Sequence, residues 1–346
     1  MKTLILSRGT DRERGFILFK LVLLSLIMTL LLGAKLFSQS SLIYLEGQAV
    51  GSYESLTNDL RPYSFHPQES MQKPSVGIDL IQRFGTRNRD FGYLSIQARL
   101  AYDENKDSRL EAQLYNAFID LKTSAFDVWI GHNKPATGLS LNLDNHAQLL
   151  MDNTMSGLVF DRDWGMGLKF DRQDPNLSVS LTTGSGMSLY YDDSWLASAR
   201  AGIGEYSRDG YSAGITLANG NVFKTMGYTI MHNKTAHKLL LGGVDYSRRI
   251  ANLESRSEIL AGSFHEYPAF TALSRLSWYP LAEDRLQIDV QAQLYEIKRA
   301  GTQNYSASVS YRILSDLTLR GSYNYQSPAD SHVIALQLYY YKGITF

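Results

Sequence analysis

The last segment of the chain, Ser331–Phe346, alternates between two kinds of side chain and ends on an aromatic residue. The apolar side chains on one face are Ile334, Leu336, Leu338, Tyr340, Ile344 and Phe346. A soluble domain usually ends in a frayed, polar terminus. An apolar, aromatic terminal strand is instead typical of the closing strand of a transmembrane β-barrel, with one face toward lipid and the other toward a lumen.

The same period-two pattern recurs along the chain. From Arg285 to Leu294, polar residues at odd positions alternate without a break with apolar residues at even positions. Strict alternation over this length predicts a strand with one apolar face and one polar face in contact with water. Similar segments of 9–11 residues or longer, enough for a tilted strand to cross a bilayer, recur through the mature chain.

Marking every such segment gives seventeen candidates, whereas bacterial single-chain barrels have an even strand number with both termini on the periplasmic side. Asn221–His232 breaks this parity and is assigned to an outer loop, as an extra-membrane hairpin. The predicted strands are 42–53, 74–85, 91–102, 109–122, 126–132, 156–171, 176–184, 195–206, 210–219, 237–249, 253–264, 270–279, 285–297, 303–313, 317–326 and 331–346. Short turns then alternate with longer links at 54–73, 133–155, 185–194 and 220–236.

The fold class predicted is therefore all-β, a transmembrane antiparallel β-barrel of sixteen strands; fourteen or eighteen strands remain alternatives, because sequence-based boundaries are uncertain by several residues. A soluble β-sandwich also alternates. It would have to divide the mature chain into two or more cores, and no Pro/Gly/Ser-rich linker marks such a division.

The N-terminal segment has the form of a secretory signal peptide. Basic residues precede an apolar run from Leu21 to Gly33, and small polar residues follow at Ser38–Ser41. This run is shorter than the roughly 20 residues of a membrane-spanning helix, although an N-terminal anchor helix extended by Leu36 and Phe37 remains an alternative. The predicted organisation is a signal peptide at 1–40 and a single barrel domain at 41–346.

Composition narrows the function classes. The chain has no cysteine, which excludes disulfides and thiolate metal sites. Residues 1–40 hold six of the 34 basic and two of the 34 acidic residues, so the mature chain keeps 28 basic and 32 acidic residues. A nucleic-acid binder would carry a basic excess. Twenty-two tyrosines fit the aromatic girdles of outer-membrane barrels.

The faces opposite the apolar stripes carry charges. The candidate pore-lining residues are Arg99, Arg200, Arg256, Arg275, Arg285, Arg312, Arg320, Glu111, Glu258 and Asp289. A sixteen-stranded barrel has a water-filled lumen, so these charges are expected to be solvated and to set a transverse field that favours small polar solutes. The alternative is that they form pairs between neighbouring strands and only stabilise the wall.

The longest link, Asn133–Met155, is the third outer loop. In large barrels such a loop can fold inward, and its candidate constriction residues are Lys134, Asp144 and His146. Its leucines, Leu139, Leu141, Leu143, Leu149 and Leu150, are poorly suited to solvent and favour packing against the wall. An ordinary surface loop is the alternative.

Catalytic signals are weak. The seven histidines are scattered, and the sequence contains no HExxH, GxSxG or P-loop. A rim-active enzyme would need a Ser/His or Asp/His group on the outer loops, which polar loop residues such as Asp144 and His146 do not establish. The sequence therefore predicts no enzyme, no cofactor and no metal.

Within this framework, Gly92–Ser140 resembles the phosphate-selective outer-membrane porins. The resemblance rests on Arg99-Leu100 with Tyr102, on Leu114–Asp120, on Trp129-Ile130-Gly131 and on Lys134-Pro135, followed in order by Trp164–Gly167, Arg200, Gly242–Asp245 and Glu258. It implies a sixteen-stranded, usually trimeric channel with a loop folded into the lumen. Phosphate selectivity in that family depends on a dense basic path, whereas here the arginines are interleaved with acids.

The predicted function is a porin in the outer membrane of a Gram-negative envelope, a passive channel for small hydrophilic solutes, with anions such as phosphate as one candidate class. Expected partners are outer-membrane lipid, the solutes, the barrel-assembly machinery through the strand ending at Phe346, and two further copies in a homotrimer. A plugged structural or adhesion barrel, whose outer loops bind a partner, is the alternative.

Overall fold

The computed structural model describes residues 38–64, 72–86, 89–104, 106–141, 148–170, 175–204, 210–231, 234–298 and 300–345. Sixteen long strands dominate this part of the chain. They are β1 (Ser38–Glu54), β3 (Ser75–Thr86), β4 (Arg89–Tyr102), β5 (Leu110–Lys122), β6 (Asp127–Asn133), β7 (Asp163–Phe170), β8 (Asn176–Thr182), β9 (Trp195–Gly204), β10 (Tyr211–Phe223), β13 (Ala236–Ile250), β14 (Leu253–Phe264), β15 (Tyr267–Trp278), β16 (Leu286–Ile297), β17 (Ala300–Leu314), β18 (Leu317–Ser327) and β19 (Ser331–Thr345).

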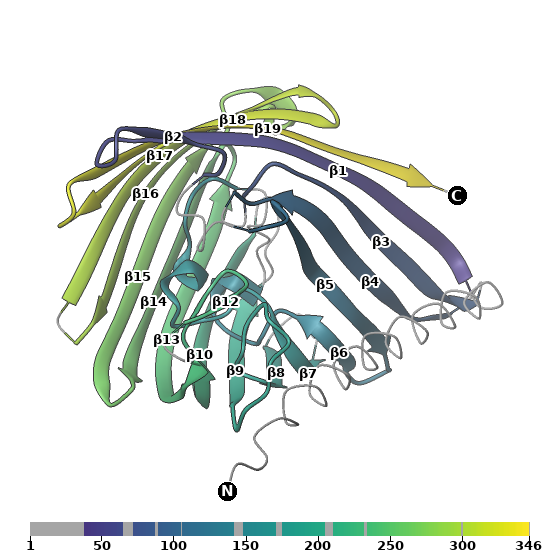
Figure 1. Ribbon diagram of the computed structural model, residues 1–346. Coiled ribbons are helices and arrows are strands. Elements are labelled where there is room, and N and C mark those ends of the chain that lie inside the picture. The colour runs from purple at the N-terminus through teal and green to yellow at the C-terminus, as the bar shows by residue number, and fades with distance from the viewer. Residues whose placement is uncertain are drawn as a thin grey trace, which may run out of the picture.

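Each long strand pairs antiparallel with its neighbours, and the sheet closes on itself. The closure lies between β1 and β19, which pair from Leu42 opposite Thr345 to Glu54 opposite Val333; Figure 1 shows these two strands side by side. A closed sheet leaves no unpaired edge, as a membrane requires. We call the end at which β1 begins and β19 ends the inner end, and the opposite end the outer end.

The outside of the barrel is apolar. Alternate side chains such as Leu217, Leu240, Val244, Ile259 and Leu336 are between 47% and 66% exposed, although they lie in the middle of strands. Exposed aromatic residues lie toward the outer end at Tyr53, Trp195, Tyr305 and Tyr323, and toward the inner end at Tyr211, Tyr246, Trp278 and Tyr311. An apolar band between two aromatic girdles is the surface of a transmembrane barrel.

The connections differ between the two ends. At the inner end, adjacent strands are joined by links of two to seven residues, the longest being 279–285, which contains the 3₁₀ turn η4 (Ala282–Asp284). At the outer end, links 55–74, 134–162, 183–194 and 224–235 are long, whereas 265–266, 298–299 and 328–330 are short. The predicted contrast between short inner turns and longer outer links is confirmed from β1 to β13, whereas beyond β13 the outer links are short as well.

The predicted sixteen-strand barrel is confirmed for the part of the chain that the structure describes. Segment 221–232 adds no wall strand: β10 continues to Phe223, and the short strands β11 (Thr225–Met226) and β12 (Thr229–Ile230) then form a separate hairpin. A further short strand, β2 (Asp59–Arg61), folds back on the outer end of β1.

One predicted strand was wrong in extent. The alternation suggested a strand over 156–171, but β7 begins only at Asp163. Residues Asn153–Ser156 form the 3₁₀ turn η2, capped by Asp152 and ended by Gly157 at φ 76°. The left-handed backbone at Gly157 interrupts the extended chain, so the third outer loop continues to residue 162.

The termini are only partly described. Strand β1 already pairs with β3 at Ser38 and Ser40, three residues before the predicted mature start. The predicted signal peptide up to residue 37 and the terminal Phe346 lie outside the described residues, and the cleavage position stays a prediction. No helix in the described ranges is long and apolar enough to span a membrane.

Candidate functional site

The outer loop 134–162, which we call the crossing loop, runs inside the barrel. Its first arm follows the wall: the N–H of Ala136 donates to Ser180 Oγ on β8 at 2.9 Å, and that of Gly138 donates to Thr216 Oγ1 on β10 at 3.0 Å. The N–H of Leu139 then donates to Glu258 Oε1 on β14 at 2.8 Å. These bonds hold the arm against the wall below the outer rim.

The middle of the crossing loop reaches the far wall. Gln291 on β16 donates from Nε2 to the carbonyl oxygen of Met151 at 2.6 Å. Leu149 packs with Val50 of β1 and Ala335 of β19. Because the loop leaves the wall at β6 and returns at β7, these contacts mean that it spans the lumen.

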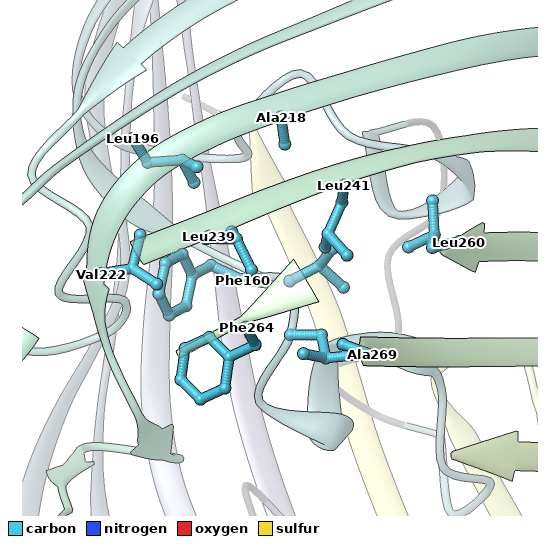
Figure 2. Packing of buried hydrophobic residues seen from close by; sticks show 11 residues of the cluster. Phe160, Leu196, Ala218, Val222, Leu239, Leu241, Leu260, Phe264 and Ala269 are labelled. Atoms are coloured by element: carbon cyan, nitrogen blue, oxygen red, sulfur yellow. The ribbon is translucent and has the colours of Figure 1, made fainter. Parts of the chain in front are cut away.

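The returning arm covers an apolar patch on the inner wall. Leu158, Val159 and Phe160 pack against inward side chains of β9, β10 and β13–β15 (Figure 2). Those side chains are Leu196, Ala218, Val222, Leu239, Leu241, Leu260, Phe264 and Ala269. An apolar surface in a water-filled lumen would be unfavourable, at about 25 cal/mol per Å² left exposed. The patch therefore stabilises the inward position of the loop.

Glu258 joins both arms of the crossing loop. While Oε1 accepts from Leu139, Oε2 accepts from Asn153 Nδ2 at 2.6 Å. Gly138 lies against the same carboxylate with φ 46°, and a Cβ there would lie 1.5 Å from Oε1. Only glycine allows this close approach, so Glu258 and Gly138 together fix where the loop enters the lumen.

Asp152 follows the far-wall contact and faces the space above the loop. Its carboxylate accepts from Thr154 N at 2.9 Å and caps η2. Burial, together with the neighbouring Asp161 carboxylate, raises the pKa of Asp152 above its ordinary value. Its carboxyl group therefore retains a proton to a higher pH than an exposed aspartate would.

Several predicted pore-lining charges are buried and paired. Arg200 donates from Nε and Nη2 to both oxygens of Asp245, at 2.9 and 2.6 Å, and it is 2% exposed. Arg99 lies 3.4 Å from Glu46, and Arg256 pairs with Glu254. The expectation of solvated charges was wrong for these arginines, because the crossing loop and neighbouring side chains exclude water. They form ion pairs, as the alternative expected, but not between neighbouring strands: Arg99 and Arg200 reach acids two strands away, and Arg256 pairs within β14.

The other predicted residues lie in different surroundings. Glu111 is half-buried and accepts from Lys73 Nζ at 2.9 Å. Arg275 is 4% exposed and donates to Gln148 of the crossing loop at 2.6 Å. Lys134 is half-buried at the start of that loop, and the predicted Asp144 and His146 lie outside the described residues.

The remaining predicted charges gather at the inner end. Arg285, Arg312, Arg320 and Asp289 share one cavity of ≈ 120 Å³ below the tip of the crossing loop. A second cavity, of ≈ 50 Å³, lies between the loop and the outer hairpin, and its lining includes Asp152, Asp161 and Arg162. The segment 148–155 contributes to both cavities and therefore separates an outer from an inner space.

Sequence reasoning missed Arg162, which organises the outer cavity. Its Nε donates to Asn116 Oδ1 at 2.7 Å and its Nη1 to Asp161 Oδ1 at 2.6 Å, and its guanidinium lies 4.1 Å from the Tyr115 ring centroid. The residue was hidden inside the predicted strand 156–171. The available signal was the run of three charges, Asp161 to Asp163, which breaks the alternation.

The buried carboxylate of Asp163 was missed for the same reason. It accepts from the N–H groups of Trp164, Gly184 and Gly186, at 2.9, 2.7 and 3.1 Å. Thr183 Oγ1 adds a bond at 2.8 Å. This carboxylate, which is 0% exposed, fixes the start of outer loop 183–194 over the crossing loop.

Gly214 provides a first test of the wall charges. It faces inward on β10, opposite Asp245, and a Cβ would lie 2.6 Å from the Arg200 guanidinium carbon. We expect Gly214→Val to destabilise the barrel by about 1–3 kcal/mol, the usual cost of overpacking, as measured by urea unfolding in lipid. Gly242→Val is the control, because its nearest neighbour lies at 3.6 Å; equal losses for both variants would contradict this account.

In the described ranges, no group of three or more His, Cys, Asp or Glu residues is arranged so that it could hold a metal ion. The prediction of a non-enzymatic protein stays a prediction.

Comparison with known proteins extends the description of the fold. No protein-family model and no curated protein matches the sequence. Among solved structures, a loop-deletion form of OmpT, an outer membrane protein of Vibrio cholerae, matches with TM-score 0.61 at 12% identity, over 88% of this chain and 99% of that one. OprB of Pseudomonas putida matches with TM-score 0.55 at 11% identity, over 91% and 96%.

An anion-selective porin of Comamonas acidovorans matches with TM-score 0.60 at 9% identity, over 89% of this chain and all of that one. Identities this low speak for the fold alone. These structural matches, together with the apolar outside of the barrel, show that the chain has the fold of an outer-membrane porin barrel.

Proposed function

We propose that the protein is a passive channel of the Gram-negative outer membrane for small hydrophilic solutes, with the crossing loop as its constriction. The observation that carries this proposal is the pair of cavities on either side of segment 148–155, inside a closed barrel whose inner wall carries many polar side chains. A sixteen-stranded barrel is wide enough for an aqueous channel. A loop across it narrows the passage without adding any chemistry.

Conductance in planar bilayers tests the proposal. Protein purified from membranes should produce stepwise currents in potassium chloride, each step marking the insertion of a channel. Reversal potentials in a salt gradient would then give the sign of its ion preference. Reproducible insertion without current would overturn the proposal.

A plugged structural barrel is the second candidate, and the packing of Leu158–Phe160 on the inner wall favours it. The burial of Arg99 and Arg200 points the same way, since ions that conduct past a charge must reach it. This candidate predicts no current from the intact protein and a current once the tip of the crossing loop is removed.

We propose export through the N-terminal signal peptide, assembly guided by the terminal strand, and a homotrimer in the membrane. Anions, phosphate included, are the proposed solute class because the inner cavity carries more arginines than acids. Chemical cross-linking in membranes would test the trimer.

A further inference from the structure

The inner cavity is lined by the crossing loop and by the barrel wall. The tip of the crossing loop, Gln148–Leu150, forms one side of it. Three arginines from the inner ends of adjacent strands line another: Arg285 immediately before β16, Arg312 near the end of β17 and Arg320 near the start of β18. The hydroxyl residues Ser310 and Thr318 lie between them. This space lies below the loop tip and is separate from the outer cavity.

These three arginines differ from the paired arginines of the wall. Arg320 donates to the neutral Gln337 Oε1 at 2.9 Å, Arg312 donates to the carbonyl oxygen of Glu283 at 3.3 Å, and Arg285 lies over the Tyr311 ring at 5.9 Å. None of them forms an ion pair with a described residue. Guanidinium groups that face a polar cavity without carboxylate partners retain hydrogen-bonding capacity for an anion.

The charge of the cavity is net positive. Two acids also line it, but Asp284 forms an ion pair with Arg249 at 2.6 Å. Among the described residues, Asp289 accepts from the neutral Gln287 and Ser308, each at 2.8 Å. Three positive charges less the single charge of Asp289 leave two. The volume of ≈ 120 Å³ exceeds several times the 10–15 Å³ that one water needs.

The positive groups are held apart. Arg320 is drawn toward β19, where its guanidinium also lies 4.9 Å from the Tyr339 ring centroid, whereas Arg312 is drawn toward the turn Ala282–Asp284. In the β17–β18 register Arg320 lies opposite Ser310, two residues from Arg312. Two residues along a strand correspond to roughly 7 Å.

Separated cations in a cavity of net charge two suit a solute with an anionic group at each end better than a compact anion. We infer that the inner cavity is a binding site for a short organic dianion with a carboxylate at each end. Arg320 holds one carboxylate and Arg312, with Arg285, the other. This inference rests on the proposed channel function, because it names the solute class that this channel would favour.

Calorimetric titration of the detergent-purified full-length protein tests the site without requiring conduction. Succinate should bind at least about tenfold more tightly than acetate or inorganic phosphate, because only a dianion of this length reaches both arginine positions. Arg320→Gln and Arg312→Gln should each weaken succinate binding about tenfold or more, as expected for loss of one charge-assisted contact. Binding of acetate should change less.

Arg248→Gln is the matched control. Arg248 also lies near the inner end, on β13, but its side chain is exposed on the opposite face from the buried Ser247. This variant should bind succinate like the unmodified protein. Equal binding of phosphate and succinate, equal weakening by Arg248→Gln, or no heat with succinate would each overturn the inference. If the protein conducts chloride but does not bind succinate in this way, the proposed channel function stands and only the proposed binding site is wrong.

Discussion

Replacing Asp163 with alanine should lower the free energy of unfolding by roughly 3–5 kcal/mol, because several buried donors would lose their acceptor at about 1–3 kcal/mol each. The donors are the N–H groups of Trp164, Gly184 and Gly186 and the hydroxyl of Thr183. Asp163 is 0% exposed, so water cannot readily replace it. Urea unfolding in lipid, followed by tryptophan fluorescence, measures the loss.

The damage should be concentrated in outer loop 183–194, which begins at these donors. Limited proteolysis of intact cells should therefore cut Asp163→Ala within this loop faster than the unmodified protein. Asp163→Asn retains one acceptor oxygen and should lose less stability. Asp192→Ala, an exposed change in the same loop, should stay within about 0.5 kcal/mol of the parent. A comparable loss for Asp192→Ala would refute the role assigned to Asp163.

The barrel itself was readable from the sequence because its physics is local and periodic. Each wall strand has a lipid face and a lumen face, so a segment such as Arg285–Leu294 records its environment in every second residue. A closed barrel with both termini at the same end must also have an even number of strands. One wrongly assigned segment makes that number odd and so reveals itself. This is why 221–232 could be rejected as a separate wall strand: the structure places 221–223 at the end of β10 and a separate hairpin after them.

The interior was much less predictable, since it depends on contacts between residues far apart in sequence. Alternation shows that Arg200 faces inward, but only the three-dimensional register reveals that Gly214 leaves space for it to reach Asp245. Likewise, the leucines of the third outer loop predicted packing, but not that Leu149 would pack on Val50 of β1 and Ala335 of β19, from the two ends of the sequence. The sequence prediction also extended β7 too far, because the apolar run Leu158–Phe160 packs on the inner wall from the crossing loop and does not pair in the sheet.

Removing the tip of the crossing loop should raise single-channel conductance by about threefold or more, since ion flow through a wide barrel is limited by its narrowest section. The structure suggests where to cut. Leu139 and Asn153 both bond to the carboxylate of Glu258, so the ends of segment 140–152 lie close together. Replacing 140–152 by two glycines therefore removes the tip and leaves both arms attached to the wall.

The design also retains Leu158–Phe160, so the apolar patch of the inner wall stays covered and the barrel should fold. Heat-modifiable migration on gels would confirm folding before any recording. Gln148→Ala is the control, because it removes the bond to Arg275 without shortening the loop, and it should change conductance little. If only the truncated protein conducts, the intact protein is a plugged barrel. Equal conductance with and without the tip would show that the constriction lies elsewhere. A threefold increase over a conducting parent would identify the crossing loop as the element that sets the size of the channel.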